Sequence, residues 1–333
     1  MAARVAALFV DLEGDRPLPS VERALSGPGS GVDASWHRRV KVVTGGQGPG
    51  QRDLQTLDRD RARLPLAGPG FIVVLGCTSG AGQSTVAVMT GLTLAAVRDV
   101  PVAALDLNPG DTSIAARITP AALVTALLAG EGPEPAHRTG SQARLPRTDW
   151  RERPGRRPSA ARLDVIADPP GTDGHLPDGY DYQRLAGLLA ARYPLTMIDP
   201  APSRLSRALS VADQLVLVAP VGADTAGALA NTQQWLSAHG YGEIAARAVT
   251  VINGVGRRPS EDVLRAESAA RGRCRAIVRV PRDDQLPVRP DELPALNPQT
   301  RLAYTALAGL LVAGLAAGRE ARVRGRSPGD HSD

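Results

Sequence analysis

The chain has 333 residues, a net charge of +5 and only 3% aromatic residues. This length suits one large α/β domain with appendages or two small domains, and 43% apolar residues are enough for a core of Ala, Val, Leu and Ile. A mildly basic total is compatible with nucleic acid or an anionic membrane as a partner and demonstrates neither. The two cysteines, Cys77 and Cys274, do not form a disulfide framework. The start of the chain lacks a signal-peptide pattern, so we expect a cytoplasmic protein.

Residues 1–70 contain two strand-like pieces, Val5–Val10 and Arg38–Val43, separated by Gly-, Pro- and Ser-rich sequence. A polar, charged stretch follows from Gln51 to Arg63. We interpret this region as an N-terminal arm or small extension. It either adds edge strands to the domain that follows or is loosely ordered.

From Phe71 onward, short apolar runs typical of strands alternate with stretches typical of helices. Strands are predicted over Phe71–Gly76, Val102–Asp106, Leu163–Ala167, Leu195–Asp199, Gln214–Ala219, Ala248–Asn253 and Ala276–Val280. Helices are predicted over Ser84–Val97, Pro120–Ala129, Tyr180–Arg192, Thr225–His239 and Ser260–Ala270. Apolar strands joined by helical crossovers predict an α/β fold, a doubly wound and mostly parallel sheet with helices on both faces.

The segment at residues 131–161 interrupts this alternation with many Pro, Gly and Arg residues. We interpret it as a surface insertion, because such a composition does not support a packed core. It is either a solvated loop or an electrostatic contact for nucleic acid, lipid headgroups or an acidic partner. Trp150 is its only aromatic residue, so a base-stacking platform is poorly supported.

The apolar run Leu302–Gly318 spans about 17 residues, the lower limit for a membrane helix. It is rich in Ala and Gly and has no polar face, unlike an interfacial helix. We therefore expect a final helix that packs against the sheet, not an integral membrane segment. Residues 319–333 are predicted to form a basic, polar tail.

A glycine-rich turn follows the predicted strand Phe71–Gly76 and leads directly into a helix of small residues. Glycines permit a tight turn and close approach, while backbone N–H groups and the helix N-terminus face an anion. A hydroxyl in the first helical turn, which we assign to Ser84, can bind Mg²⁺. Strand, turn and helix together therefore predict a phosphate-binding loop.

This segment resembles the deviant P-loop of the MinD/ParA family, whose pattern is Lys-Gly-Gly-x-Gly-Lys-[Ser/Thr]-[Ser/Thr]. Further motifs follow in the family's order. Val102–Pro109 resembles the motif that ends Asp-x-Asp-Pro, and Leu195–Pro200 resembles the Walker B strand. Val249–Asn253 resembles the strand whose Asn contacts the base, and Val280–Asp283 resembles a later base-side loop. The resemblance covers roughly residues 70–317.

The resemblance implies a P-loop NTPase-like domain over residues 71–318 that binds ATP or ADP with Mg²⁺. The residues expected to bind nucleotide are Thr78, Ser79, Gly80, Ala81, Gly82, Gln83, Ser84, Thr85, Asn253 and Pro281. The expected Mg²⁺ ligands are Ser84, Asp106 and Asp199. Helix capping is the alternative role for the two aspartates, and an ordinary turn residue is the alternative for Asn253.

Three positions depart from the family pattern. Gln83 stands where the family has the general P-loop lysine, and Thr78 stands where it has its signature lysine. Asn108 replaces the acidic residue that positions the attacking water. The only lysine in the chain is Lys41, so no lysine near the loop can substitute. A neutral hydrogen bond contributes less than a charged one, so we expect weak nucleotide binding and little or no hydrolysis, with no confident catalytic residue.

Three functions are compatible with this sequence. The first is a regulatory, positioning or scaffolding factor, in analogy to degenerate relatives that accompany secretion, pilus or conjugation machinery. The second is an active ATPase for DNA partition or division-site placement that uses an arginine instead of lysine. The third is a nucleotide-independent interaction protein that keeps only the fold.

The partners follow from the same resemblance. We expect a nucleotide-dependent homodimer and a protein partner of unknown identity. Nucleic acid is a candidate partner through the Arg-rich insertion or the tail. The expected location is the cytoplasm, either at the membrane periphery or in a partner complex.

Overall fold

A computed structural model of the protein describes most of the P-loop-like region and parts of the region before it. The described residues are 41–43, 51–108, 113–118, 120–129, 162–167, 179–256, 258–284, 286 and 296–324. The predicted strand Val5–Val10, the insertion at 131–161 and the last nine residues lie outside them.

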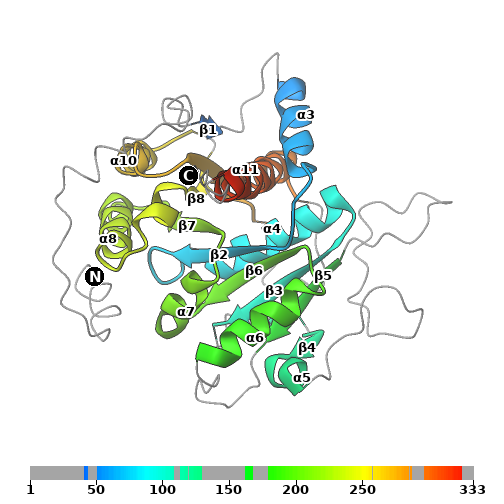
Figure 1. Ribbon diagram of the computed structural model, residues 1–333. Coiled ribbons are helices and arrows are strands. Elements are labelled where there is room, and N and C mark those ends of the chain that lie inside the picture. The colour runs from blue at the N-terminus through cyan, green and yellow to red at the C-terminus, as the bar shows by residue number, and fades with distance from the viewer. Residues whose placement is uncertain are drawn as a thin grey trace, which may run out of the picture.

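A nine-stranded sheet with every pairing parallel forms the centre of the domain (Figure 1). Its strand order is β1-β9-β8-β7-β2-β6-β3-β5-β4. The strands are β1 (Lys41–Val43), β2 (Gly70–Gly76), β3 (Pro101–Leu107), β4 (Ala122–Leu123), β5 (Arg162–Ala167), β6 (Leu195–Pro200), β7 (Gln214–Pro220), β8 (Val249–Val255) and β9 (Ala276–Pro281). The predicted doubly wound α/β fold is therefore confirmed, with the strands predicted after Phe71 placed within two residues.

The central strand β2 explains why these strands are apolar throughout. Ile72, Val73 and Val74 are all fully buried. Successive side chains of a strand point to opposite faces, so Ile72 and Val74 enter one apolar cluster while Val73 and Leu75 enter the other. A parallel sheet covered on both faces needs this continuous apolar pattern.

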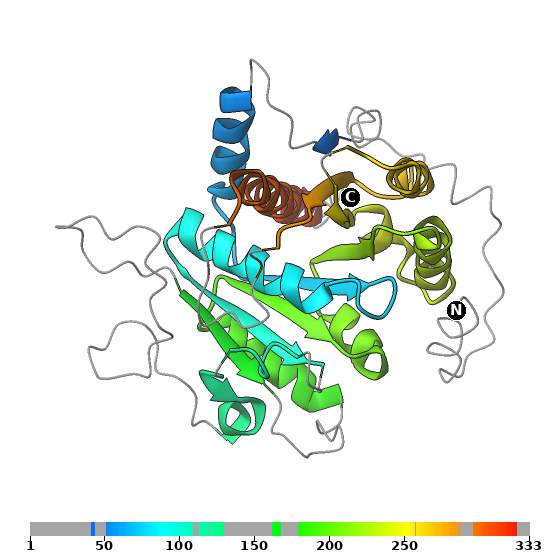
Figure 2. The ribbon, with the colours of Figure 1, turned by 180° about the vertical axis from the view of Figure 1, so that it is seen from behind.

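The helices divide between the two faces of the sheet. One face carries α6 (Gly179–Ala190), α7 (Leu205–Ser210), α8 (Thr225–Ala238), α9 (Gly242–Ala246) and α10 (Glu261–Ala270). The short elements η1 (Pro202–Arg204) and α5 (Val124–Ala129) adjoin α7 and α6. The opposite face carries α4 (Gln83–Arg98) and α11 (Pro298–Arg324), which cross the sheet in front of the viewer in Figure 2.

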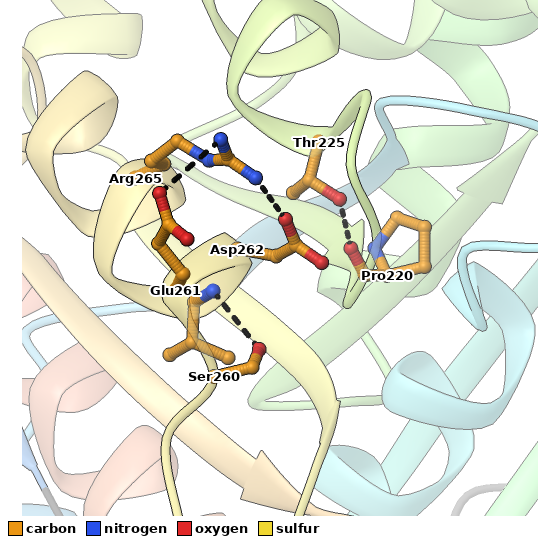
Figure 3. Close-up of polar contacts among 7 residues, drawn as sticks. Pro220, Thr225, Ser260, Glu261, Asp262 and Arg265 are labelled. Carbon is orange, nitrogen blue, oxygen red and sulfur yellow. Dashed lines mark hydrogen bonds and ion pairs between the residues drawn. The ribbon is translucent and has the colours of Figure 1, made fainter.

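Helix α10 shows how the sequence sets a helix boundary. The Ser260 hydroxyl accepts a hydrogen bond from the Val263 N–H at 3.4 Å and caps the helix. Glu261 and Asp262 in the first turn favour the positive end of the helix dipole. Arg265 pairs with both carboxylates, at 3.5 Å from Glu261, on an exposed face (Figure 3). The predicted start at Ser260 is the N-cap of the observed helix.

Helix α11 is longer than the predicted final helix. It begins at Pro298, where a proline in the first turn loses no helical hydrogen bond. It continues to Arg324, six residues into the predicted tail, because Arg, Glu and Ala are good helix formers. Its stretch Pro298–Gly318 is long and apolar enough to cross a membrane by length and composition, yet 61% of an 18-residue window in it is buried in the domain. The predicted packing against the sheet is confirmed by this burial.

Part of the N-terminal arm packs on the same domain. β1 pairs with β9 at the sheet edge, as one of the two alternatives for this region expected. The polar stretch from Gln51 forms a helix that was not predicted, α3 (Gln51–Ala62), which packs against α11. A Cβ atom on Gly309 of α11 would lie 2.5 Å from the Asp58 carbonyl oxygen, so only glycine permits this helix contact.

Candidate functional site

The phosphate-binding loop predicted from the sequence lies at the centre of the carboxyl edge of the sheet. It follows β2, which lies between β6 and β7, and it leads into α4. Gly80 and Gly82 have φ angles of 74° and 90°, a backbone region that favours glycine. The strand order reverses here, because the chain adds β3 on one side of β2 and β7 on the other, and ligands of doubly wound folds bind at such a point.

Gly82 and Asn253 form the tightest contact of the loop. A Cβ atom on Gly82 would lie 2.3 Å from Asn253 Nδ2, so no other residue fits without a shift. Asn253, on β8, donates from Nδ2 to the Ala81 carbonyl oxygen at 3.0 Å. Asn253 therefore supports the loop backbone, and its contact with a base stays a prediction.

The N-terminus of α4 has free hydrogen-bond donors that face the loop. The first helical hydrogen bond runs from the Val86 N–H to the Gly82 carbonyl oxygen at 2.9 Å. The N–H groups of Gln83, Ser84 and Thr85 therefore have no acceptor within the helix, and no side chain caps this end. Free N–H groups and the helix dipole together make an anion-binding arrangement.

Gln83 makes three hydrogen bonds that tie the loop to the sheet. Its Nε2 donates to Asp199 Oδ1 at 2.5 Å and to the Pro200 carbonyl oxygen at 2.9 Å. Its Oε1 accepts from the Gly76 N–H at 2.7 Å. The side chain thus bridges the ends of β2 and β6 and points into the protein.

Asp199 is the most strongly perturbed acid of the site. It is fully buried at the end of β6. Burial raises the pKa of its carboxyl group to about 7, while the neighbouring Ser84 hydroxyl and Gln83 amide oppose that rise. Among the described residues, its second oxygen, Oδ2, has no hydrogen-bond partner of normal geometry. A buried carboxylate oxygen without a partner beside a hydroxyl is suited to bind a cation.

Asp106 lies opposite Asp199 on the adjacent strand β3 and has a different environment. Its Oδ1 accepts from the Asn108 N–H at 3.1 Å, and its Oδ2 accepts from the Ala115 N–H at 2.7 Å. Burial raises the pKa of Asp106, and these backbone N–H groups lower it. Both oxygens of Asp106 therefore hold the chain after β3, and its binding of Mg²⁺ stays a prediction.

The remaining predicted residues lie around the same edge. The hydroxyl oxygen of Thr78 is buried and unpartnered, whereas Ser79 is exposed. Asn108 is half-buried beside Asp106. Pro281 ends β9, which β8 and β7 separate from β2. The structure therefore brings together the loop, Asp106, Asp199 and Asn253, and it places Pro281 at the rim.

Arg117 is a site residue that sequence reasoning did not single out. It follows β3 in the short segment Ser113–Ile118, and its Nη1 donates to Thr85 Oγ1 at 3.2 Å. Its positive charge lowers the pKa of Asp199. No sequence signal distinguishes this arginine, because it is one of 39 basic residues and belongs to no motif of the pattern.

A sequence comparison with known proteins finds the same protein in two strains of Mycobacterium tuberculosis. No protein-family model matches the chain. The chain is 30% identical over 201 residues to the ESX-1 secretion-associated protein EspI of Mycobacterium tuberculosis. The match covers 58% of this chain, and it spans 28% of the length of that relative.

Solved structures share the fold at low sequence identity. Apo McdA from Cyanothece has a TM-score of 0.50 and 16% identity, covering 73% of this chain and 99% of that chain. A ParA family ATPase from Chlorobium tepidum has a TM-score of 0.47 and 17% identity, covering 73% and 98%. MinD in the MinC:MinD complex of Aquifex aeolicus has a TM-score of 0.44 and 14% identity, covering 79% and 98%. The likeness to McdA shows that the chain shares the fold of that protein.

Proposed function

We propose that this chain is a ParA/MinD-like nucleotide-binding protein in which the bound nucleotide regulates assembly with a protein partner, with little or no ATP hydrolysis. The position of Gln83 carries this proposal. The loop backbone has the shape and free N–H groups of a phosphate cradle, while the side chain at the lysine position is neutral and turned into the protein.

The expected weakness in hydrolysis follows from the charges around the loop. Phosphoryl transfer needs positive charge on the transferring group and a positioned nucleophile. Gln83 and Thr78 supply no charge, and Asn108 has no carboxylate to orient water. Nucleotide binding requires fewer charged side chains than hydrolysis does, because backbone N–H groups and the helix dipole still attract the phosphates.

The residues present fit a bound Mg²⁺ ion. Ser84 offers a hydroxyl and Asp199 offers the unpartnered Oδ2, both oxygen ligands of the kind Mg²⁺ prefers. Among the described residues no cluster of three or more His, Cys, Asp or Glu side chains is present, so water and phosphate oxygens would complete the shell. Asp106 lies on the strand beside Asp199, and each of its oxygens also accepts one backbone N–H.

The sequence relative supports a secretion-associated process. EspI is named for its association with ESX-1 secretion. We extend this role to the present chain as part of the proposal, with recruitment from the cytoplasm to a secretion complex and dimerisation upon nucleotide binding. The match to only 28% of EspI leaves the partner to be found by experiment.

Calorimetry of Mg-ATP binding, run in parallel with a phosphate-release assay, tests the proposal. Binding without release supports it. Release that disappears in Asp199→Ala supports the second candidate, an active ATPase, which the position of Arg117 beside Thr85 favours. Absence of binding at high nucleotide concentration contradicts both and leaves an interaction protein that keeps the fold.

Two substitutions at one position sharpen this test. Gln83→Lys places a charge beside the loop and should tighten Mg-ATP binding about tenfold, because a lysine turned toward the phosphate adds a charged hydrogen bond that Gln83 does not make. Gln83→Glu is its matched control, since it has the same size and should weaken binding through repulsion of both phosphate and Asp199. Equal affinities for the two variants would contradict phosphate binding at this loop.

A further inference from the structure

Arg117 lies on a segment that the site itself holds in place. Ser113 Oγ accepts from the Ala116 N–H at 3.0 Å, and the Arg117 N–H donates to the Ile114 carbonyl oxygen at 3.0 Å. The Ile114 side chain is 1% exposed and anchors the turn in the core. The position of Arg117 is therefore set by a closed turn with a buried anchor.

Asp106 connects this turn to the end of β3. Its Oδ2 accepts from the Ala115 N–H at 2.7 Å, two residues before Arg117. A buried carboxylate that accepts backbone N–H groups fixes the chain strongly, because hydrogen bonds to charged groups are the stronger ones. Asp106 is thus a positioning residue for the segment that carries Arg117.

The Arg117 guanidinium reaches the first turn of α4. Its Nη1 lies 3.2 Å from Thr85 Oγ1, next to the free N–H group of the same residue. Arg117 is half-buried, so water is partly excluded around its charge. A positive charge beside uncapped helix N–H groups strengthens an anion site.

We infer that Arg117 contacts the phosphate chain of the nucleotide and supplies, from the segment after β3, the positive charge that the loop lacks. This inference rests on the proposed nucleotide binding. It assigns the charge to the same chain, so a dimer mate or partner is not needed for binding.

The test compares four proteins by calorimetry: wild type, Arg117→Gln, Arg117→Lys and Arg265→Gln. Each is titrated with Mg-ATP and with tripolyphosphate at low and at high ionic strength. Arg117→Gln should weaken both ligands about tenfold or more and reduce the dependence of binding on salt. Arg117→Lys should stay within about threefold of wild type. Arg265→Gln is the control, because it removes the same charge from the exposed face of α10 (Figure 3).

A double variant separates charge from structure. Gln83→Lys combined with Arg117→Gln removes the positive charge at position 117 and adds one at position 83. Mg-ATP binding should return to within about threefold of wild type. Wild-type affinity in Arg117→Gln overturns the inference and leaves the proposed function standing. A loss that the double variant does not restore, together with a lowered melting temperature, also overturns it by showing a structural role.

The two ligands distinguish the remaining outcomes. A wild-type protein that binds tripolyphosphate but no ATP, and loses that binding in Arg117→Gln, supports the inference and contradicts the proposed function. A wild-type protein that binds neither ligand overturns both.

Discussion

The two ends of helix α4 differ in how their backbone groups are satisfied. At the C-terminal end, the Asp99 and Val100 N–H groups donate to the Ala95 carbonyl oxygen. Arg98 Nη1 donates to the carbonyl oxygens of Ala62 and Leu64 at 2.7 and 2.8 Å. At the N-terminal end, no side chain caps the first turn, and its N–H groups face a glycine-rich loop. One helix thus has a closed structural end and an open end suited to bind an anion.

The C-terminal end of this 16-residue helix therefore contributes to stability, and its N-terminal end contributes to ligand binding. Substitutions at the C-terminal end should lower stability and leave ligand binding unchanged. Substitutions at the N-terminal end should change binding, and some should raise stability. The predictions below test this separation, beginning with the largest expected effect.

Gly82→Ala should affect both properties most strongly. The added Cβ would combine a φ of 90° with a clash of 2.3 Å against Asn253 Nδ2. We expect a loss of about 2–4 kcal/mol in the free energy of unfolding, from backbone and contact strain together, and loss of measurable Mg-ATP binding. Urea unfolding and calorimetry measure the two effects.

Gly80→Ala is the matched control for this change. Gly80 also has a positive φ, yet a Cβ there would meet no atom within 4 Å. Its cost should be limited to about 1–2 kcal/mol of backbone strain. Equal destabilisation of the two variants would contradict the role of the Gly82–Asn253 contact.

Asp199→Asn should stabilise the ligand-free protein while it abolishes Mg²⁺-dependent binding. The folded-state pKa of about 7 exceeds the ordinary value of 3.8, so between these values the folded chain holds a proton that the unfolded chain has released. Stability of the wild type should therefore fall as pH rises through this window, and the variant should lack that slope. At pH 8 we expect the variant to be more stable by on the order of 1–3 kcal/mol.

Chemical unfolding from pH 4 to pH 8 measures this effect. Asp164→Asn serves as a comparison, because Asp164 is a buried acid with charged and hydrogen-bonding partners, Arg162 and Tyr193. That variant should lose stability. An Asp199→Asn protein that follows the wild-type pH dependence would contradict the assigned titration.

Arg98→Ala tests the closed end of α4. It leaves two carbonyl oxygens of the α3–β2 connection without their donor. We expect a loss of about 1–3 kcal/mol in the free energy of unfolding and unchanged Mg-ATP affinity in the folded protein. A change in affinity above threefold would show that the two ends are coupled.

Asn253→Ala should have the smallest effect. It removes the hydrogen bond to the Ala81 carbonyl oxygen and should cost about 1 kcal/mol of stability. Nucleotide affinity should fall a few-fold through a less fixed loop. Competition between ATP and GTP gives a second measurement, since a base contact by Asn253 would also alter the preference between the two.

The sequence was sufficient for the fold because the sheet signals are local. Runs such as Ile72–Val74 are apolar throughout, and longer stretches typical of helices separate them. The loop was predictable for the same reason, since strand, glycines and hydroxyls are contiguous. The loop follows β2 and leads into α4, whereas Pro281 lies at the rim, on a strand that two others separate from β2.

The contacts between distant segments could not be predicted. Helix α3 is polar in sequence, and its contacts with α11 at Gly309 and with Arg98 of α4 join segments far apart in the chain. No sequence signal distinguishes Arg117 from the other arginines. Its contact with Thr85 depends on the fold of the turn at Ser113–Ile118. The engagement of Gln83 with Asp199 depends likewise on the packing of β2 beside β6.

The pairing of α3 with α11 has a consequence for biosynthesis. On the ribosome, α3 emerges more than 230 residues before α11. A similar number of residues separates the strand β1 from its partner β9. Contacts of such large sequence separation form late and slow folding. Until they form, α3 lacks its packing surface and the growing sheet exposes the apolar face that α11 later covers. Helix α11 can therefore cover this face of the sheet only after translation has passed residue 298. A nascent chain stalled before that residue should be a strong substrate for chaperones.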